Sequence, residues 1–145
     1  MQAREPDRSH MAKQVRRVKP PSLYAGAPYA YASVARQKAL VFTAGACPLD
    51  ASGRTVAPGD VASQARRAVR NLFIALKSAG SSPALVLKTT VYVASPRRSD
   101  LVTAWKEIRA AFRGADPPST LLGVAALGYP DQLVEIEAVA TVSAA

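Results

Sequence analysis

The sequence of 145 residues contains a single cysteine, Cys47, and a single histidine, His10. One cysteine excludes an internal disulfide framework. One histidine in a polar segment excludes a Ser-His-Asp triad, a Cys-His pair and a conventional zinc site of histidines and cysteines. No apolar run reaches the roughly 18 residues of a membrane-spanning helix, and the N-terminus lacks the apolar stretch of a secretory signal. We therefore expect a cytoplasmic protein with no membrane partner and no metal site.

Glycine-rich phosphate-binding loops are also missing, because the sequence has neither GxxxxGK[ST] nor GxGxxG between a strand and a helix. Acidic residues are few, with 10 Asp and Glu against 19 Lys and Arg, and the net charge is +9. Residues 1–20 hold six basic and two acidic residues without apolar periodicity, so we expect a disordered basic leader. Its string Ser9-His10-Met11 is typical of a cloning linker and predicts that part of the leader is vector-derived. Residues 21–145 are expected to form one domain, and nucleic-acid binding is not favoured, because so much of the charge lies in the leader.

Two segments have the apolar spacing of amphipathic helices. In residues 61–76 apolar side chains recur at helical spacing behind Asp60, which is a good N-cap. Residues 101–112 repeat the pattern, and Ser99 or Asp100 is expected to cap this second helix. The arginines of the first helix are interpreted as a solvated face, because a nucleic-acid site would need aromatic residues between them.

Five segments are rich in β-branched and apolar residues and are bounded by turn signals: 29–35, 39–44, 85–94, 120–127 and 133–142. We expect the first two to pair as a hairpin. The order ββαβαββ predicts an α+β fold, with one mostly antiparallel sheet and two helices on one face. Alternate residues of the last strand place apolar side chains on both faces of the sheet. An apolar second face predicts cover by another subunit, and hence a homo-oligomer with sites between subunits.

Glu135 and Glu137 are two residues apart in the last strand, so their carboxylates lie on one face about 7 Å apart. At a covered interface, one of them could hold or activate a water molecule as a general base. For Glu137 we favour pairing with a neighbouring basic group. For Glu135 the sequence leaves the two interpretations equally open.

Other candidate residues have weaker chemical support. Ser119 and Thr120 stand at the entrance of a strand and could offer hydroxyl or backbone contacts, but no histidine can activate the serine. Cys47 lacks a cationic neighbour in the sequence, so a small apolar role is favoured over a nucleophilic one. Tyr29 and Trp105 could line a pocket or fill the core, and for Trp105 core packing is the favoured interpretation.

Several strings, in order, closely resemble the Rid family (reactive intermediate deaminase, or YjgF-like). They are Ala27-Pro28-Tyr29, Phe42-Thr43-Ala44-Gly45, the helix 60–72, Lys88-Thr89-Thr90-Val91-Tyr92-Val93 and Val134-Glu135-Ile136-Glu137-Ala138-Val139-Ala140. The resemblance covers residues 24–142. It implies a chorismate-mutase-like fold, a homotrimer with three clefts between subunits, and no cofactor. It also implies hydrolysis of small enamines and imines such as 2-aminoacrylate.

Position by position, the resemblance also implies differences. The family arginine that binds the substrate carboxylate stands where this sequence has Ser119. The glutamate thought to position the hydrolytic water matches Glu135, and the tyrosine of the Gly-Pro-Tyr motif matches Tyr29. Family polar positions are apolar here at Ala44, Ala46 and Val102. The resemblance therefore implies a divergent member whose cleft keeps its carboxylate and loses its cation.

We accordingly expect a hydrolase or deaminase that acts on a small, largely uncharged imine or enamine and does not share the typical 2-aminoacrylate specificity. Glu135 would orient water, and Tyr29 and Trp105 would shape the pocket. The other expected substrate-binding positions are Ser119, Thr120, Cys47 and Ala44. The alternatives are a non-catalytic protein that binds a metabolite or a partner in the same clefts and, less favoured, RNA binding or cleavage. A replacement cation could come from a loop, at Arg54, Arg97 or Arg98.

Overall fold

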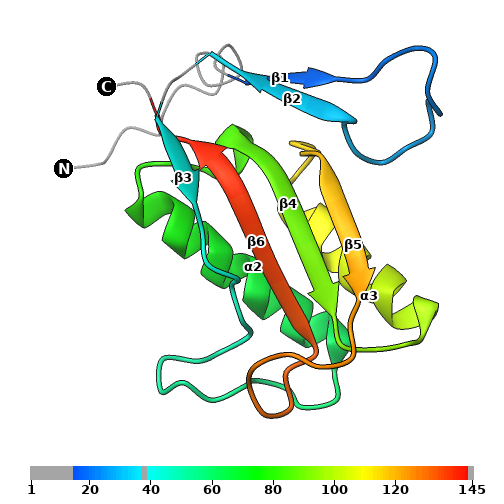
Figure 1. Cartoon of the computed structure of the whole chain (residues 1–145). Helices are drawn as coiled ribbons and strands as arrows, with labels where there is room; N and C mark the ends of the chain where they lie inside the picture. Colours follow the sequence, from blue (N-terminus) through cyan, green and yellow to red (C-terminus); the bar gives the residue numbers. More distant parts are fainter. Residues whose placement is uncertain (1–14, 37–38, 144–145) are drawn as a thin grey trace.

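Four strands form the main sheet in the order β3-β6-β4-β5 (Figure 1). The computed structural model describes residues 15–36 and 39–143. The central strands are β6 (Val134–Thr141) and β4 (Val86–Val93), flanked by β3 (Leu40–Phe42) and β5 (Ser119–Gly123). Two of the three pairings are antiparallel and β4 pairs with β5 in parallel, which confirms the expected α+β, mostly antiparallel sheet.

Two helices, α2 (Val61–Ser78) and α3 (Arg98–Ala111), lie behind the sheet in Figure 1 and cover one of its faces. The Asp60 side chain accepts the Ser63 N–H at 3.0 Å and caps α2, as the sequence predicts. The helix ends at Ser78, and Gly80, two residues later, has a φ of 76° that lets the N–H groups of Gly80 and Ser81 return to the carbonyls of the last turn. These signals are local, so the position of α2 could be predicted.

The main core lies between the helices and the sheet. On β6, alternate residues face the helices and are fully or almost fully buried, and β4 contributes in the same way. The helices supply the opposite side of the core, from Ala65 to Leu76 on α2 and from Ala104 to Phe112 on α3. The core residues of the two strands are Val86, Val91, Val93, Val134, Ile136, Ala138 and Ala140. Alternation therefore points Glu135 and Glu137 away from the helices.

No helix of the described residues lies on the opposite face of the sheet, which is called the open face below. Exposed apolar side chains lie on it, with Phe42 73% and Leu122 43% exposed. Register places Phe42 beside Val139, and Leu122 beside Tyr92. The apolar second face that the sequence predicts is therefore present in the fold.

A separate two-stranded hairpin, β1 (Val15–Val18) with β2 (Ala32–Ala35), lies near one end of the main sheet (Figure 1). The expected hairpin of residues 29–35 with 39–44 is wrong, because β2 pairs with β1, and β3 pairs with β6. The expectation of a disordered leader at 1–20 is wrong for β1, whose Val15 packs on Leu85. Residues 1–14 of that leader lie outside the described residues.

Arg17 fastens the hairpin to the rest of the molecule. Its Nε donates to Ala115 O at 3.0 Å, and its Nη1 donates to Ser33 Oγ at 2.8 Å and to Val86 O at 2.5 Å. Burial lowers the pKa of Arg17, while the charge of Asp116 acts in the opposite direction. A basic residue in an expected tail is thus a half-buried structural donor.

The other differences are at element boundaries. The N-cap of α3 is Arg97 without a side-chain cap bond, so Ser99 and Asp100 lie in the first helical turn rather than at the cap. The strand expected over 120–127 ends at Gly123, where an added Cβ would approach Ser95 O at 2.9 Å. Within the described residues, no helix combines the length and apolar character needed to cross a membrane.

Replacing Arg17 by alanine is expected to lower the free energy of unfolding by about 1.5–3 kcal/mol, because a charged donor to buried carbonyls is lost. Arg16→Ala, one residue earlier and exposed on the same strand, is the matched control and should change stability by no more than about 0.5 kcal/mol. Urea unfolding measures both variants. Equal losses would contradict the fastening role of Arg17.

Candidate active site

Glu135 stands at the start of β6, on the open face, and is half-buried. Its Oε2 accepts a hydrogen bond from Gln132 Nε2 at 3.0 Å and another from the Cys47 thiol at 3.6 Å. A Cβ added at Gly45 would overlap Glu135 Oε1, so only glycine leaves room for the carboxylate in this position. The carboxylate is thereby fixed by two hydrogen-bond donors and by the absence of a side chain at Gly45.

The segment that carries Gly45 and Cys47 runs beside β6 through a single bridge. Ala46 N donates to Ile136 O at 2.7 Å, and Ile136 N donates to Ala46 O at 3.2 Å. Helix α2 holds the next residues, since Asn71 Nδ2 donates to the carbonyl of Cys47 at 2.8 Å. The position of the thiol therefore depends on both the sheet and a helix.

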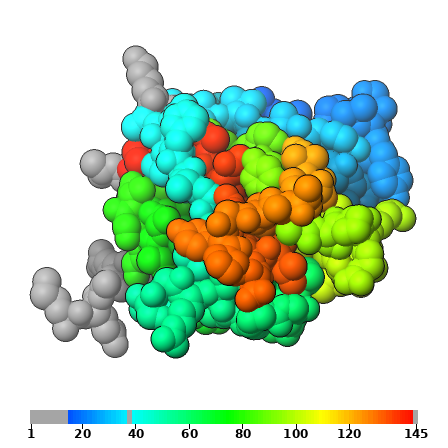
Figure 2. Space-filling model, turned by 60° about the horizontal axis from the view of Figure 1, so that its bottom comes forward, coloured from blue at the N-terminus to red at the C-terminus, as the bar shows by residue number. Residues whose placement is uncertain are grey.

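The loop before β6 is fixed by a buried glutamine of α2. Gln64 Oε1 accepts the Leu133 N–H at 2.7 Å, and its Nε2 donates to Asp131 O at 2.9 Å. Gln132, between those two residues, is buried and accepts the Tyr129 N–H on its Oε1 at 3.0 Å. This bond orients the amide so that its Nε2 points at Glu135. In Figure 2 the loop between β5 and β6 (orange) lies beside the segment that leads into α2 (blue-green).

Burial raises the pKa of the Cys47 thiol, and the charge of Glu135 raises it further. The thiol is therefore held in its protonated form, in which it can donate to the carboxylate but is a poor nucleophile. This agrees with the interpretation that disfavours a nucleophilic cysteine.

Tyr92 lies between the two glutamates of the open face. It is the cross-strand partner of Glu135, and its hydroxyl donates to Glu137 Oε1 at 2.7 Å. This hydrogen bond is the main reason that the pKa of Tyr92 is raised. Glu137 thus pairs with a phenol rather than with the basic group that the sequence analysis favours.

Ser119 and Thr120 are adjacent in β5 but face opposite ways. Ser119 pairs with Thr89, which is buried on the helix side, and their hydroxyls lie 2.5 Å apart. Thr120 is on the open face and accepts a hydrogen bond from Lys88 Nζ at 2.9 Å. Within one protomer, Thr120 therefore shares a face with Glu135 and the Ser119 side chain does not.

The remaining candidates are spread over the molecule. Ala44 is exposed next to Gly45, on the segment that borders Glu135. Tyr29 stacks edge-on against Tyr31, with ring centres 5.6 Å apart, in the loop before β2. That loop is bonded to the segment before β5 through Ala30, whereas Glu135 lies where β4 ends. Trp105 is half-buried on α3, behind the sheet. The fold of one chain does not bring Tyr29 or Trp105 to Glu135.

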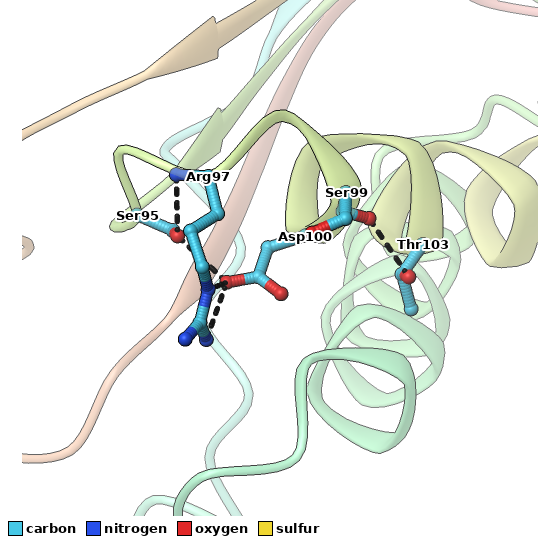
Figure 3. Close-up of polar contacts among 5 residues, drawn as sticks. All are labelled: Ser95, Arg97, Ser99, Asp100 and Thr103. Atoms are coloured by element: carbon cyan, nitrogen blue, oxygen red, sulfur yellow. Dashed lines mark hydrogen bonds and ion pairs between the residues drawn. The ribbon is translucent and has the colours of Figure 1, made fainter.

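The three arginines considered as replacement cations are placed elsewhere. Arg97 Nε and Nη2 both donate to Asp100 Oδ2, at 3.1 and 3.0 Å, at the start of α3 (Figure 3). Ser95 Oγ donates to the same carboxylate oxygen at 2.6 Å. Arg98 borders a separate hollow beside α3 and β5, and Arg54 lies in an exposed turn held by Asp50. None of the ion pairs formed within the described residues, 15–36 and 39–143, includes Glu135.

Sequence reasoning missed the roles of Gln64, Gln132 and Tyr92. A glutamine on the apolar side of the α2 pattern was a usable signal, because a buried amide must find partners. No comparable signal exists for Tyr92, because its position beside the two glutamates depends on the register between β4 and β6. The described part of the chain contains no group of three or more His, Cys, Asp or Glu that could hold a metal ion.

A family model described as Endoribonuclease L-PSP matches residues 21–142. The chain is similar to the 2-iminobutanoate/2-iminopropanoate deaminases of Mus musculus and Rattus norvegicus. The mouse protein is 34% identical over 110 residues, which are 76% of this chain and 79% of that protein. The rat protein is 32% identical over 130 residues, which are 90% and 93% of the two chains.

Solved structures show the same relationship. The YyfB protein of the Rid family from Yersinia pestis superposes with a TM-score of 0.83 at 30% identity, covering 89% of this chain and 99% of that one. The YjgF gene product of E. coli gives a TM-score of 0.62 at 30% identity, covering 81% and 90%. These likenesses confirm the expected YjgF-type architecture.

Glu135→Gln is expected to increase the rate of Cys47 alkylation by iodoacetamide at pH 8 several-fold. Removing the neighbouring charge lowers the pKa of the thiol and so raises the thiolate fraction at that pH. Glu107→Gln, which removes a carboxylate paired with Arg66 on the helices, is the control. Because the chain has one cysteine, the rate reports this thiol alone. Equal rates in all three proteins would contradict the contact between Cys47 and Glu135.

Proposed function

The chain belongs to the Rid family, also described as Endoribonuclease L-PSP, and from this premise we propose that it hydrolyses a small imine or enamine. The proposed site is a cleft between subunits of a homotrimer, with Glu135 as its catalytic residue. Two similar mammalian proteins are 2-iminobutanoate/2-iminopropanoate deaminases, which supports the reaction class. The proposed substrate differs from the 2-aminoacrylate typical of the family.

The observation that carries the proposal is the Glu135 carboxylate, held by two neutral donors and free of an ion pair among the described residues. Gln132 and Cys47 both donate to Glu135 Oε2 and so occupy acceptor positions on that oxygen. A carboxylate has about four acceptor positions, so the group can still accept a hydrogen bond from water. A cation paired with the carboxylate would compete with water for these acceptor positions. The geometry suits a group that orients water.

The chemistry needs little beyond such a carboxylate. The water oxygen adds to the imine carbon as the C=N π pair moves onto nitrogen, and Glu135 takes the proton that the water loses. Return of that proton to nitrogen gives the carbinolamine. Glu135 then moves the carbinolamine hydroxyl proton to nitrogen, so that the C–N bond breaks with its electron pair leaving on ammonia while the oxygen forms the carbonyl group. The products are a carbonyl compound and ammonia, so that an imine and one water are consumed.

The difference in substrate is supported by position 119. The resemblance places the family's carboxylate-binding arginine there, where this chain has Ser119, and its hydroxyl lies against Thr89 instead. A hydrogen bond to a charged group contributes about 1.5–3 kcal/mol, and a bidentate pair more. We therefore propose weak binding of 2-imino acids.

Two observations support the homotrimer: the apolar open face, and the distance of two candidate pocket residues from Glu135 within one protomer. Tyr29 and Trp105 lie away from Glu135 in their own protomer. They could shape its pocket only from a neighbouring subunit. Exposed apolar side chains on the open face, with Phe42 among them, favour burial against another copy.

Glu135→Gln is expected to reduce kcat/KM for imine hydrolysis by about 10²–10⁴-fold, because the amide cannot accept the proton from water. Ammonia release is measured with a series of imines formed in the assay by an amine oxidase or an amino-acid oxidase. The control is Glu107→Gln, which should retain the full rate. Hydrolysis by Glu135→Gln at the unaltered rate would remove the proposed role of Glu135.

Ser119→Arg is expected to raise kcat/KM for 2-iminobutanoate by about tenfold or more, because a charged donor for the substrate carboxylate is restored. Ser119→Gln, of similar length without the charge, is the control and should change little. If neither the unaltered chain nor Ser119→Arg hydrolyses any imine, the function is that of the alternative, a non-catalytic protein that binds a metabolite or a partner in the same clefts.

A further inference from the structure

The open face around Glu135 is rich in hydrogen-bond acceptors. Glu135 and Glu137 project from β6 on the same side, and Tyr92 stands opposite Glu135 on β4. Because the Tyr92 hydroxyl gives its hydrogen to Glu137 Oε1, its oxygen has only acceptor positions left. A ligand here meets two carboxylates and a phenol oxygen, and all of them attract hydrogen-bond donors.

The same face is also apolar at its borders. Leu122 lies beside Tyr92 on one side, and Phe42 and Val139 lie beyond Glu137 on the other. Tyr92 and Phe42 offer aromatic rings, which attract cations to their faces when water is excluded. Apolar surroundings strengthen the attraction between a carboxylate and a cation, because the local dielectric constant falls.

We propose that the Glu135 site selects apolar imines in their protonated, cationic form, and that the Tyr92–Glu137 pair is its specificity-determining element. This inference rests on the proposed function and names its substrate class: iminium ions formed from amines that lack a carboxylate. The iminium N–H groups donate to Tyr92 Oη and the carboxylates, and the apolar substituent lies against Leu122 or Phe42. Water that Glu135 orients attacks the adjacent carbon, and the iminium and one water yield a carbonyl compound and ammonium.

Lys88 is a cation on the same face and belongs to the charge balance of the site. Its Nζ donates to Thr120 Oγ1, away from Tyr92. Lys88 and Tyr92 are four positions apart along β4, which corresponds to about 13 Å. Glu135, Glu137 and Lys88 together give the face a net charge of −1, and the positive charge of Lys88 lies at one end of it.

Three ligands with one ring and different charges test the inference: benzylammonium, benzyl alcohol and benzoate. Their affinities for the full chain are measured by ligand-observed NMR at low salt. Benzylammonium is expected to bind at least about tenfold more tightly than benzoate, since hydrogen bonds to charged groups contribute about 1.5–3 kcal/mol each. Its affinity should fall as sodium chloride is raised, because salt screens the charges.

Variants identify the element responsible. Glu137→Gln and Tyr92→Phe should each weaken benzylammonium binding about tenfold while the affinity for benzyl alcohol stays unchanged, which a merely structural role would not produce. Tyr92→Phe keeps the ring, so it tests the hydroxyl without emptying the face. Lys88→Gln should tighten benzylammonium binding, and Glu107→Gln should not alter it.

The outcomes separate this inference from the proposed function. Equal or tighter binding of benzoate, or Tyr92 and Glu137 variants that bind benzylammonium normally, would overturn the inference while Glu135-dependent imine hydrolysis still stood. Selective benzylammonium binding without hydrolysis of any imine would overturn the proposed function and leave the cationic selectivity. Hydrolysis of 2-imino acids in preference to amine-derived imines would overturn the inference and the proposed weak binding of 2-imino acids, while Glu135-dependent imine hydrolysis still stood.

Discussion

The absence of a side chain at Gly45 is the constraint on which the site depends. Any Cβ at this position would occupy the space of the Glu135 carboxylate. The bridge between Ala46 and Ile136 brings the two segments together at a fixed distance. Because the backbone comes so close, the carboxylate has to lie between Gln132 and Cys47, where both donate to it. One glycine therefore converts a strand glutamate, which would otherwise sample several rotamers, into an ordered acceptor.

The sheet separates the structural from the chemical functions of its strands by alternation. In β6, Val134, Ile136, Ala138 and Ala140 are buried against the helices, and Glu135, Glu137 and Val139 between them are half-buried on the open face. The core thus fixes the direction of Glu135 without contacting it. Helix α2 contributes in a second way, because its buried Gln64 holds the loop that carries Gln132. Stability of the helix layer and order of the carboxylate are therefore linked through one amide.

Elements governed by local signals could be predicted from the sequence, and those governed by distant partners could not. The cap at Asp60 and the alternation of β6 lie within short segments, and both are found as expected. The pairing of β2 with β1 depends on a choice between two possible neighbours, which periodicity does not decide. Arg17 shows the same limit, since its carbonyl acceptors on β4 and before β5 are far away in the chain. In the site, Glu135 was recognisable by spacing and resemblance, but Tyr92 required the register of β4 against β6.

Register also explains how the proposed site can prefer a cationic imine and still keep the carboxylate of Glu135. Position 119, where the resemblance places an arginine, stands at the start of β5, and Tyr92 stands near the end of β4, so each can change without disturbing β6. Here the Ser119 hydroxyl is hydrogen-bonded to that of Thr89 on the helix side. On the open face, the Tyr92 oxygen offers an acceptor rather than a donor, because its hydrogen is given to Glu137. In the proposed mechanism water activation needs only Glu135, whose carboxylate is ordered by Gly45 and by its two donors independently of any substrate. The proposal therefore assigns the choice of imine to the strands beside β6.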